Sequence, residues 1–248
     1  MKERLTVVKV GGQVVENETA LASLLQWFTA IDTPKLLVHG GGKSATRLAS
    51  QLGIETKMLD GRRITDARML EIVTMVYGGG VNKHIVASLQ ALGINAIGLT
   101  GADMNVIRAH KRSVGEVDYG FVGDIDYADG KCLSELITKD IVPVIAPLTH
   151  DGKGTLLNTN ADTIALETAR ALADRYDVTL HYLFEKKGVL LMPDDEDSFI
   201  PVLCREEYER LIADGIVRDG MIPKLQNAFS ALDKGIKRVF ISNTEIVK

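Results

Sequence analysis

The sequence predicts an α/β fold: an open, mostly parallel sheet with helices on both faces, an αβα sandwich formed by one domain. Strand-length apolar runs alternate with segments of helical periodicity, as in successive βαβ units. Glycine follows several of these runs directly, which is typical of turns at the carboxyl ends of strands in such sheets. The 248 residues, 46% of them hydrophobic, are enough to bury the core that this fold requires.

The first predicted strand, residues 5–10, contains a lysine in an otherwise apolar or β-branched run. Continuous runs of this kind are typical of strands covered by helices on both faces. An unpaired ammonium group buried there would destabilise the fold strongly or lose its proton. We therefore expect Lys9 to lie where the strand opens into a polar cleft.

The remaining elements follow in chain order. Further strands are expected at residues 35–38, 96–99, 142–146, 179–184 and 238–241. Helices are expected at residues 18–30, 44–52, 67–77, 81–92, 131–139, 161–175, 205–214 and 223–234. Residues 105–112 and 118–127 are short and β-rich, and they predict a small β-hairpin inserted beside the parallel sheet. A loop signal at residues 149–154 suggests two lobes within the single domain, 1–150 and 151–248.

Composition excludes several classes of function. The net charge of −4 and the pI of about 5.8 argue against sequence-independent binding to nucleic acid. Cys132 and Cys204 lie far apart, so neither a disulfide framework nor a zinc site is predicted, and the five histidines show no metal-ligand spacing. No apolar run approaches the roughly 20 residues of a membrane span. We expect a cytoplasmic protein with no membrane partner.

Glycine turns after three predicted strands point to an anionic ligand. They are Gly11-Gly12, Gly40-Gly41-Gly42 and the Gly98 to Gly101 segment. Glycine lets backbone N–H groups approach an anion closely, and the helices that follow add their positive N-terminal dipoles. Because such turns gather at one edge of the sheet, the ligand is expected to be polyanionic.

The second glycine turn imitates two nucleotide-binding motifs. Residues 42–44 match the end of a Walker A loop, but Leu37 stands where that motif requires glycine, so a P-loop is not predicted. Residues 40–45 also fit G-x-G-x-x-A after a strand, with Asp60 about twenty residues further on. An NAD-dependent enzyme therefore stays open as an alternative.

Polar residues before the helix at residues 161–175 have two interpretations. Asn158, Asn160 and Asp162 alternate at the end of a strand. Asparagine and aspartate are preferred N-caps, so helix capping explains any one of them. A single cap needs only one such residue, and the others can point into a cleft.

Two basic segments also precede helices. In the Gly61 to Thr65 segment, Arg62 and Arg63 offer guanidinium groups that can hold a carboxylate through two hydrogen bonds. In the Asp219 to Lys224 turn, Lys224 falls near a helix N-terminus, where the helix dipole disfavours a cation unless an anion is also bound there. Either segment can equally be a solvated surface loop.

Together these motifs resemble the amino-acid kinase family, and the resemblance covers nearly the whole chain. Five segments carry it: residues 9–12, 38–42, 61–65, 158–162 and 220–224. The resemblance implies an open αβα sandwich whose N-terminal half binds an N-acylated glutamate and whose C-terminal half binds ATP. The implied reaction is ATP-dependent phosphorylation of the γ-carboxylate of N-acetyl-L-glutamate in arginine biosynthesis. Since a carboxylate is already a nucleophile, the implied task is to align two anions and neutralise charge.

The resemblance assigns roles to residues of this chain. Lys9 and Lys224 would stabilise the transition state, and Asp162 would position their ammonium groups. Gly11, Gly12 and Gly41 would donate N–H groups to phosphate. The substrate-binding set would be Gly41, Gly42, Arg63, Asn158 and Asn160. The nucleotide-binding set would be Gly11, Glu185, Lys187, Gly188, Val189, Leu190, Ile216, Val217 and Arg218. Mg²⁺ would arrive with ATP, without a dedicated protein site.

The chain departs from the family pattern at three places. Phe184-Glu185-Lys186-Lys187-Gly188 stands where the family commonly has Thr-Asp-Val-x-Gly, and the usual terminal Gly-Thr segment does not follow residues 238–241. In the family, a helix before the first strand accompanies hexamers inhibited by arginine. Since that helix does not precede residue 5, the resemblance implies a homodimer insensitive to arginine. Two alternatives stay open: N-succinyl-L-glutamate as the acceptor, and a non-catalytic sensor of small ligands.

Overall fold

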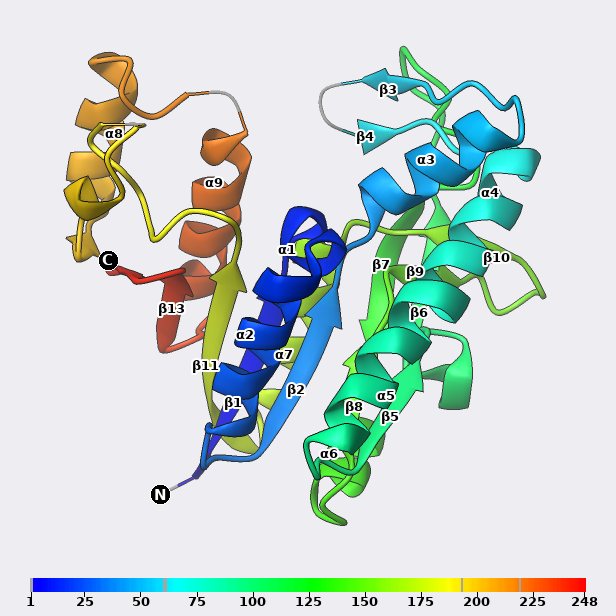
Figure 1. Ribbon diagram of the computed structural model, residues 1–248, viewed down its shortest axis with the longest axis horizontal. Coiled ribbons are helices and arrows are strands. Elements are labelled where there is room, and N and C mark those ends of the chain that lie inside the picture. The colour runs from blue at the N-terminus through cyan, green and yellow to red at the C-terminus, as the bar shows by residue number, and fades with distance from the viewer. Residues whose placement is uncertain (1, 60–61, 193, 219) are drawn as a thin grey trace.

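The computed structural model describes residues 2–59, 62–192, 194–218 and 220–248 (Figure 1). Asp60, Gly61 and Asp219 of the predicted motifs lie outside the described residues. Within the described ranges the main sheet has eight strands, and all its neighbours run parallel except β13 and β14. In spatial order the strands are β12 (Val202–Leu203), β14 (Thr244–Ile246), β13 (Arg238–Ile241), β11 (Tyr176–Leu183), β1 (Glu3–Val10), β2 (Lys35–His39), β8 (Val142–Ile145) and β5 (Ala96–Leu99). The predicted open, mostly parallel sheet is confirmed.

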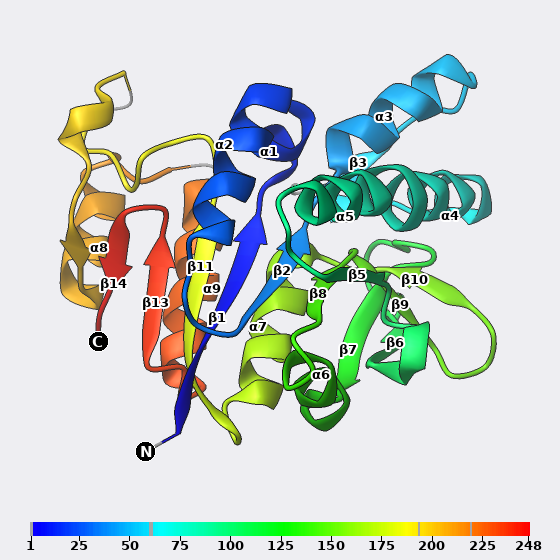
Figure 2. The ribbon, with the colours of Figure 1, turned by 60° about the horizontal axis from the view of Figure 1, so that its bottom comes forward.

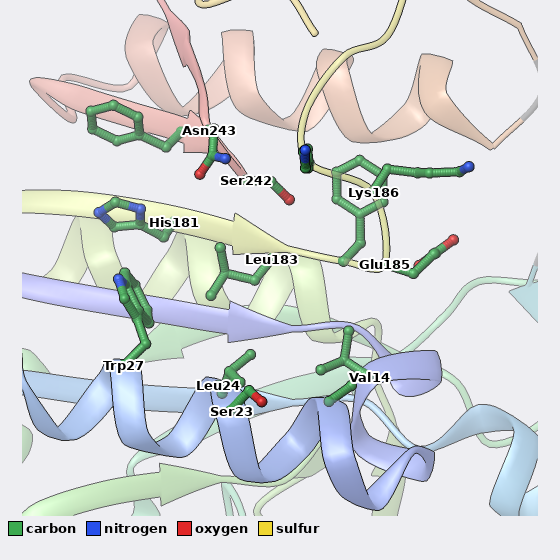
Figure 3. A pocket seen from close by; sticks show the side chains of 14 residues that line it. Val14, Ser23, Leu24, Trp27, His181, Leu183, Glu185, Lys186, Ser242 and Asn243 are labelled. Carbon is green, nitrogen blue, oxygen red and sulfur yellow. The ribbon is translucent and has the colours of Figure 1, made fainter. Parts of the chain in front are cut away.

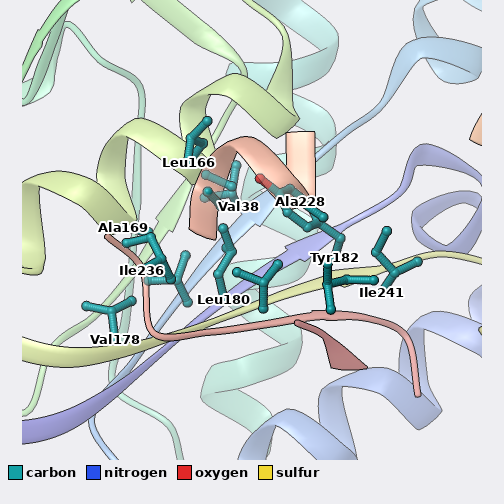
Figure 4. Packing of buried hydrophobic residues seen from close by; sticks show 14 of the residues in the cluster. Val38, Leu166, Ala169, Val178, Leu180, Tyr182, Ala228, Ile236 and Ile241 are labelled. Atoms are coloured by element: carbon teal, nitrogen blue, oxygen red, sulfur yellow. The ribbon is translucent and has the colours of Figure 1, made fainter. Parts of the chain in front are cut away.

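Helices cover both faces of this sheet, as predicted. On one face α6 (Gly130–Ile137), α7 (Ala161–Leu172) and α9 (Met221–Asp233) pack into a core that includes Leu5 and Val7 (Figure 4). On the other face α2 (Glu18–Thr29) and α5 (Asn82–Ala91) pack against Val8 and Val10. Successive residues of β1 thus enter opposite cores, which explains why its apolar run is continuous rather than alternating.

The predicted β-hairpin is present as part of a second sheet beside the β5 end of the first (Figure 2). Its antiparallel strands are β6 (Ile107–Lys111) and β7 (Gly123–Ala128). They are joined by β9 (Leu148–His150) and β10 (Leu156–Asn158), a hairpin that occupies the expected loop around residues 149–154. Three-residue strands are too short to show a period, so the sequence did not reveal them. The division into two lobes stays a prediction.

Other elements differ from the prediction mainly at their ends. The helix expected at residues 67–77 begins as α4 (Ala67–Val73) and continues as a π-helix, η1 (Thr74–Val81), into α5. Three consecutive glycines at residues 78–80 disfavour a regular α-helix there. The helices α3 (Gly42–Gln51) and α8 (Arg205–Ala213) were predicted. The strands β12 and β14 of the main sheet were not predicted, and the other unpredicted elements are also short: α1 (Gly12–Glu16), β3 (Met58–Leu59), β4 (Arg62–Arg63), η2 (Asp103–Asn105) and η3 (Glu196–Ser198). None of the described helices has the length and apolar character that crossing a membrane would need.

Candidate active site

Lys9 lies at the carboxyl end of β1, and a carboxylate neutralises its charge. Leu5 and Val7 face α7, and alternation along the strand directs Lys9 to the same face. Asp162, in the first turn of α7, places its Oδ1 2.6 Å from Lys9 Nζ, and the two side chains are 11% and 17% exposed. The predicted contact between Asp162 and Lys9 is therefore present, and it explains how an ammonium group is tolerated in a buried strand.

Two glycine turns lie against one another beside Lys9. Gly11 is the N-cap of α1 and Gly41 is the N-cap of α3, and neither helix has a side-chain cap. A Cβ on Gly12 would lie 3.3 Å from the Gly41 nitrogen and 3.4 Å from the Gly42 nitrogen, so only glycine leaves these donors uncovered. Their N–H groups have no acceptor among the described residues, as expected at the start of a helix. The predicted anion-binding turns thus meet at one place.

Glu16 links the two helices that begin at these turns. Its Oε1 accepts hydrogen bonds from the backbone N–H and the hydroxyl of Ser44, in the first turn of α3. In the amide orientation that satisfies both neighbours, the Gln13 side chain donates to Glu185 Oε1 and accepts from Lys43 Nζ, each at 3.2 Å. Both α1 and its contacts were missed by the sequence prediction because a helix of five residues shows no periodicity.

Arg63 is buried beside the second glycine turn and has no described carboxylate as a partner. It is 8% exposed, and its Nη2 donates to the Gly42 carbonyl at 2.8 Å and to Thr46 Oγ1 at 2.9 Å. Tyr77, which the sequence prediction did not include, packs its ring against Gly41, and burial raises the pKa of its hydroxyl. A buried guanidinium held by neutral groups is a favourable site for a ligand carboxylate. Arg62, in contrast, is exposed.

Asn158 reaches the same region from the second sheet. Its Nδ2 donates to Thr65 Oγ1 at 2.9 Å, which connects β10 to the end of the arginine segment. The chain at residues 119–122 runs between them: Thr65 bridges to Gly120, and the Asn158 N–H donates to the Phe121 carbonyl. The sequence prediction did not place residues 119–122 at the site, although Gly120, with φ +71°, could have indicated a tight turn.

Asn160 acts as the N-cap of α7. Its Oδ1 accepts from the N–H groups of Asp162 and Thr163 at 2.8 and 3.1 Å, and the residue is exposed. The capping interpretation of the 158–162 segment therefore holds for Asn160, whereas Asn158 and Asp162 turn toward other residues. A role for Asn160 in binding substrate stays a prediction, limited to its remaining amide group.

Lys224 lies in the first turn of α9, near the helix N-terminus as predicted. It does not pair with Asp162, whose partner among the described residues is Lys9. Its Nζ is 4.9 Å from the centre of the Phe184 ring, a cation–π contact, and no described carboxylate pairs with it. The structure has an ion pair of Asp162 with Lys9 but none with Lys224 among the described residues, so the positioning of Lys224 by Asp162 stays a prediction. A half-buried cation at a helix N-terminus, opposed by the dipole, is poised to meet an anion.

The residues predicted to bind the nucleotide divide into two groups. Val189 and Val217 are buried at 1% and 3% exposure with their side chains in the core. Their N–H groups already donate, to Thr244 Oγ1 and to the Leu211 carbonyl respectively. Gly188 is packed against Thr244 and Phe199, with no room for a Cβ. Lys187 is exposed and its Nζ is paired with Asp197 at 2.7 Å. The remaining predicted residues on these segments are Glu185, Leu190, Ile216 and Arg218, and none of them is buried.

The acidic loop at residues 194–197 contacts the chain that follows β11. Glu196 accepts from the Lys187 N–H at 2.7 Å and its Oε1 is 3.2 Å from Lys186 Nζ. Together with the Asp197 pair, these contacts hold the chain that follows β11 against the acidic loop. Exposed ion pairs of this kind contribute little stability, so they restrain the loop only weakly.

A mainly apolar groove of about 650 Å³ lies next to this chain (Figure 3). Its walls come from α2, from the end of β11 and from the turn between β13 and β14. In Figure 3 Trp27 points toward His181, and their ring centres are 5.7 Å apart. Burial lowers the pKa of His181 to about 4. Glu185 and Lys187 line one end, whereas Lys9, Arg63 and Lys224 do not line the groove.

The arrangement defines a class of protein: an α/β enzyme that gathers anionic ligands at the carboxyl ends of parallel strands, with one buried lysine among the donors. Residues 4–243 match the profile of the Amino acid kinase family, and the chain belongs to this family. This membership leaves the dinucleotide interpretation of residues 40–45 without support.

Relatives and solved structures agree with this membership. The chain is 65% identical over 242 residues to an acetylglutamate kinase of Phocaeicola vulgatus, which covers 98% of this chain and 94% of the relative. It is 61% identical over 248 residues to an acetylglutamate kinase of Bacteroides thetaiotaomicron, covering 100% and 96%. The fold is similar to the crystal structure of smu.665 from Streptococcus mutans, with a TM-score of 0.82, 24% identity and 98% coverage of both chains. Carbamate kinase from Giardia lamblia is similar with a TM-score of 0.66, 13% identity and 99% coverage of both.

Proposed function

We propose that this chain transfers the γ-phosphoryl group of ATP to the γ-carboxylate of N-acetyl-L-glutamate, in arginine biosynthesis. The observation that carries the proposal is the meeting of the Lys9–Asp162 pair with the uncovered N–H groups of Gly12, Gly41 and Gly42. Relatives that are 60–65% identical carry the name acetylglutamate kinase, and this name specifies the acceptor. The N-succinyl acceptor is accordingly not favoured.

The chemistry needs no general base. A carboxylate oxygen of the acceptor forms a bond to the γ-phosphorus, the bond from that phosphorus to the β,γ-bridging oxygen breaks, and ADP leaves with the electron pair. Negative charge shifts among the phosphoryl oxygens during this step, so fixed N–H groups and an ammonium group stabilise the transition state. Asp162 holds the Lys9 ammonium group in one direction, whereas a lysine without a partner would be free to turn.

The N-terminal half supplies most of the acceptor site, and Asn158 joins it from the C-terminal half. Arg63 and Asn158 come from elements far apart in sequence and are joined through Thr65. We assign Arg63 to a carboxylate of the acyl-glutamate, because its buried guanidinium group otherwise has only neutral partners. Gly41 and Gly42 lie between Arg63 and the phosphate donors, so the same turn contacts both reactants.

The C-terminal half supplies the nucleotide site. The chain following β11 and the first turn of α9 meet where Lys224 lies over Phe184. We assign Lys224 to the ATP phosphates, which requires its ammonium group to leave the ring. We expect the residues at 185–190 and 216–218 then to surround the nucleoside.

Mg²⁺ is expected to accompany ATP. Among the described residues no group of three or more His, Cys, Asp or Glu side chains could hold a metal ion. We expect water and phosphate oxygens to supply most of the ligands of Mg²⁺. When bound to the phosphates, Mg²⁺ would neutralise part of their charge.

A coupled assay of ADP release tests the proposal. Purified protein is supplied with ATP and, in separate reactions, N-acetyl-L-glutamate, N-succinyl-L-glutamate, glutamate, aspartate and carbamate. We expect the highest kcat/KM with N-acetyl-L-glutamate. A higher kcat/KM with N-succinyl-L-glutamate would replace the acceptor, and no ADP release with any of these compounds would favour a non-catalytic sensor.

A homodimer and a cytoplasmic location complete the proposal. Light scattering coupled to size exclusion measures the assembly directly, and a mass of twice 27.0 kDa is expected. Added arginine should leave kcat unchanged if the expected insensitivity is correct.

A further inference from the structure

We propose that His39 is a positioning residue that aims the Gly41 N–H at the transferring phosphoryl group. This inference rests on the function proposed above. His39 ends β2 and is fully buried, with its side chain on the α5 face of the sheet, opposite to Lys9. It therefore contacts neither reactant and acts through the backbone of the glycine turn.

The hydrogen bonds of His39 define its tautomer. Its Nδ1 lies 2.7 Å from the Gly40 carbonyl oxygen, which can only accept, so Nδ1 carries the proton. Asn82 Nδ2 donates to His39 Nε2 at 3.1 Å and to the Val144 carbonyl at 2.9 Å. Asn82 Oδ1 in turn accepts from Lys83 Nζ at 3.1 Å. Every member of this chain of hydrogen bonds has one consistent role.

The bond to Gly40 fixes a peptide unit rather than a single atom. The Gly40 carbonyl and the Gly41 N–H belong to the same planar trans peptide, so they point in opposite directions. When the carbonyl is held toward the α5 face, the N–H points to the other side of the turn. Gly12 lies on that side, and a Cβ built on Gly12 would be 3.3 Å from the Gly41 nitrogen. Glycine on both sides of this peptide would otherwise permit many orientations.

A neutral histidine suits this role. Burial lowers the pKa of His39 to about 4, so the ring keeps one donor and one acceptor over the whole neutral range. A charged ring would lose the acceptor that Asn82 needs, and it would place positive charge beside Lys83. The geometry of the turn is thereby kept independent of pH near neutrality.

Three substitutions at residue 39 separate this role from simple packing. His39→Asn keeps an N–H near the position of Nδ1, His39→Gln places its amide near the position of Nε2, and His39→Leu has neither. We expect kcat to fall about 10- to 100-fold in the Leu and Gln variants, since removing one such donor entirely costs roughly 10² to 10³. The Asn variant should stay within about 5-fold of the wild-type kcat, and KM for N-acetyl-L-glutamate should change less than about 3-fold in all three.

Ser134→Ala is the matched control. It removes a buried hydrogen bond to Tyr176, 3.0 Å long, on another part of the fold, and it should lower thermal stability without lowering kcat. Loss of kcat in proportion to loss of stability, or equal kcat in the Asn and Gln variants, would overturn the proposal.

Should the wild type itself release no ADP, the proposed function fails, and the ratio of ATP to ADP affinity measured by calorimetry then decides the role of His39. That ratio must fall in the Leu variant and recover in the Asn variant, and an unchanged ratio overturns the role.

Discussion

The two halves of the site differ in how far they are prepared for their ligands. In the N-terminal half, Lys9 is paired with Asp162 of the C-terminal half, Arg63 is held by Gly42 and Thr46, and the glycine turns pack against each other. In the C-terminal half, Lys224 rests on an aromatic ring, and Lys187 is paired with a loop carboxylate in solvent. Buried hydrogen bonds fix the first set, whereas weak exposed contacts hold the second.

This difference indicates where reorganisation occurs. Preformed donors in a rigid turn need not move during the reaction, which is the condition for effective electrostatic stabilisation. The cations of the C-terminal half must exchange their present partners for phosphate oxygens. We therefore expect the N-terminal half to determine kcat and the affinity for the acceptor, and the C-terminal half to determine the affinity for ATP.

Removal of the Lys9 ammonium group should have the largest effect. In Lys9→Met the charge is lost while an unbranched chain of similar length remains, and kcat should fall on the order of 10³-fold or more. The measurement is steady-state ADP release at saturating substrates. Lys2→Met is the control, because Lys2 is exposed and contacts only the Ala173 carbonyl. A kcat within 3-fold of wild type would remove Lys9 from catalysis.

Arg63→Lys should act on substrate binding rather than on turnover. Lysine keeps the charge but cannot make the paired hydrogen bonds of a guanidinium group, so KM for N-acetyl-L-glutamate should rise about 10- to 100-fold. The kcat should change much less. Arg68→Lys, at an exposed position of the neighbouring α4, provides the control. A larger change in KM for ATP than in KM for the acceptor would show that Arg63 does not bind the acceptor.

Acidification should destabilise both halves through buried histidines. The pKa of His39 and of His181 is lowered to about 4 by burial, against 6.5 in the unfolded chain. Between these values the unfolded state binds more protons, so stability is present above about pH 6.5 and is lost as pH falls toward 4. Each histidine should contribute about 2 kcal/mol to the loss in the free energy of unfolding from pH 7 to pH 5.

Urea denaturation at several pH values measures this loss. His181→Phe, which keeps an aromatic ring in the groove beside Phe240, should flatten the dependence by the share of one histidine. An unchanged slope between pH 5 and pH 7 in this variant would show that His181 is accessible to protons in the folded protein.

Asp197→Asn should have the smallest of these effects, and it should strengthen ATP binding rather than weaken it. It releases Lys187 from its ion pair, and an exposed pair is worth roughly 0.2–1 kcal/mol, so KM for ATP should fall about 2- to 5-fold. Lys187→Ala should raise the same constant. If Asp197→Asn leaves KM for ATP unchanged while Lys187→Ala raises it, the ion pair does not compete with the nucleotide.

The sequence predicted best those parts of the site that have a local signal. A lysine in an apolar strand requires a polar partner, and glycine after a strand marks an anion-binding turn, so Lys9, Gly12 and Gly41 were identified from the pattern. The resemblance to the family supplied Asp162 as the partner of Lys9. Asp162 lies 153 positions after Lys9 and has no local signal.

What the sequence did not reveal depends on packing between distant elements. Tyr77 and His39 are unremarkable in sequence, and their roles follow from contacts with Gly41 and Gly40. Glu16 caps a helix that is not its own, through Ser44. The position of Lys224 over Phe184 was not expected either, since side-chain partners across loops leave no periodic trace.

A crystal structure with N-acetyl-L-glutamate and a non-hydrolysable ATP analogue tests the contrast between the two halves most directly. We predict that Lys9, Arg63 and the glycine turns superpose on their present positions within about 1 Å, as preorganised sites do. Lys224 should leave the Phe184 ring and contact the phosphates. Rearranged glycine turns, or a Lys224 that stays on Phe184 with both ligands bound, would contradict the preformed N-terminal half and the mobile C-terminal half.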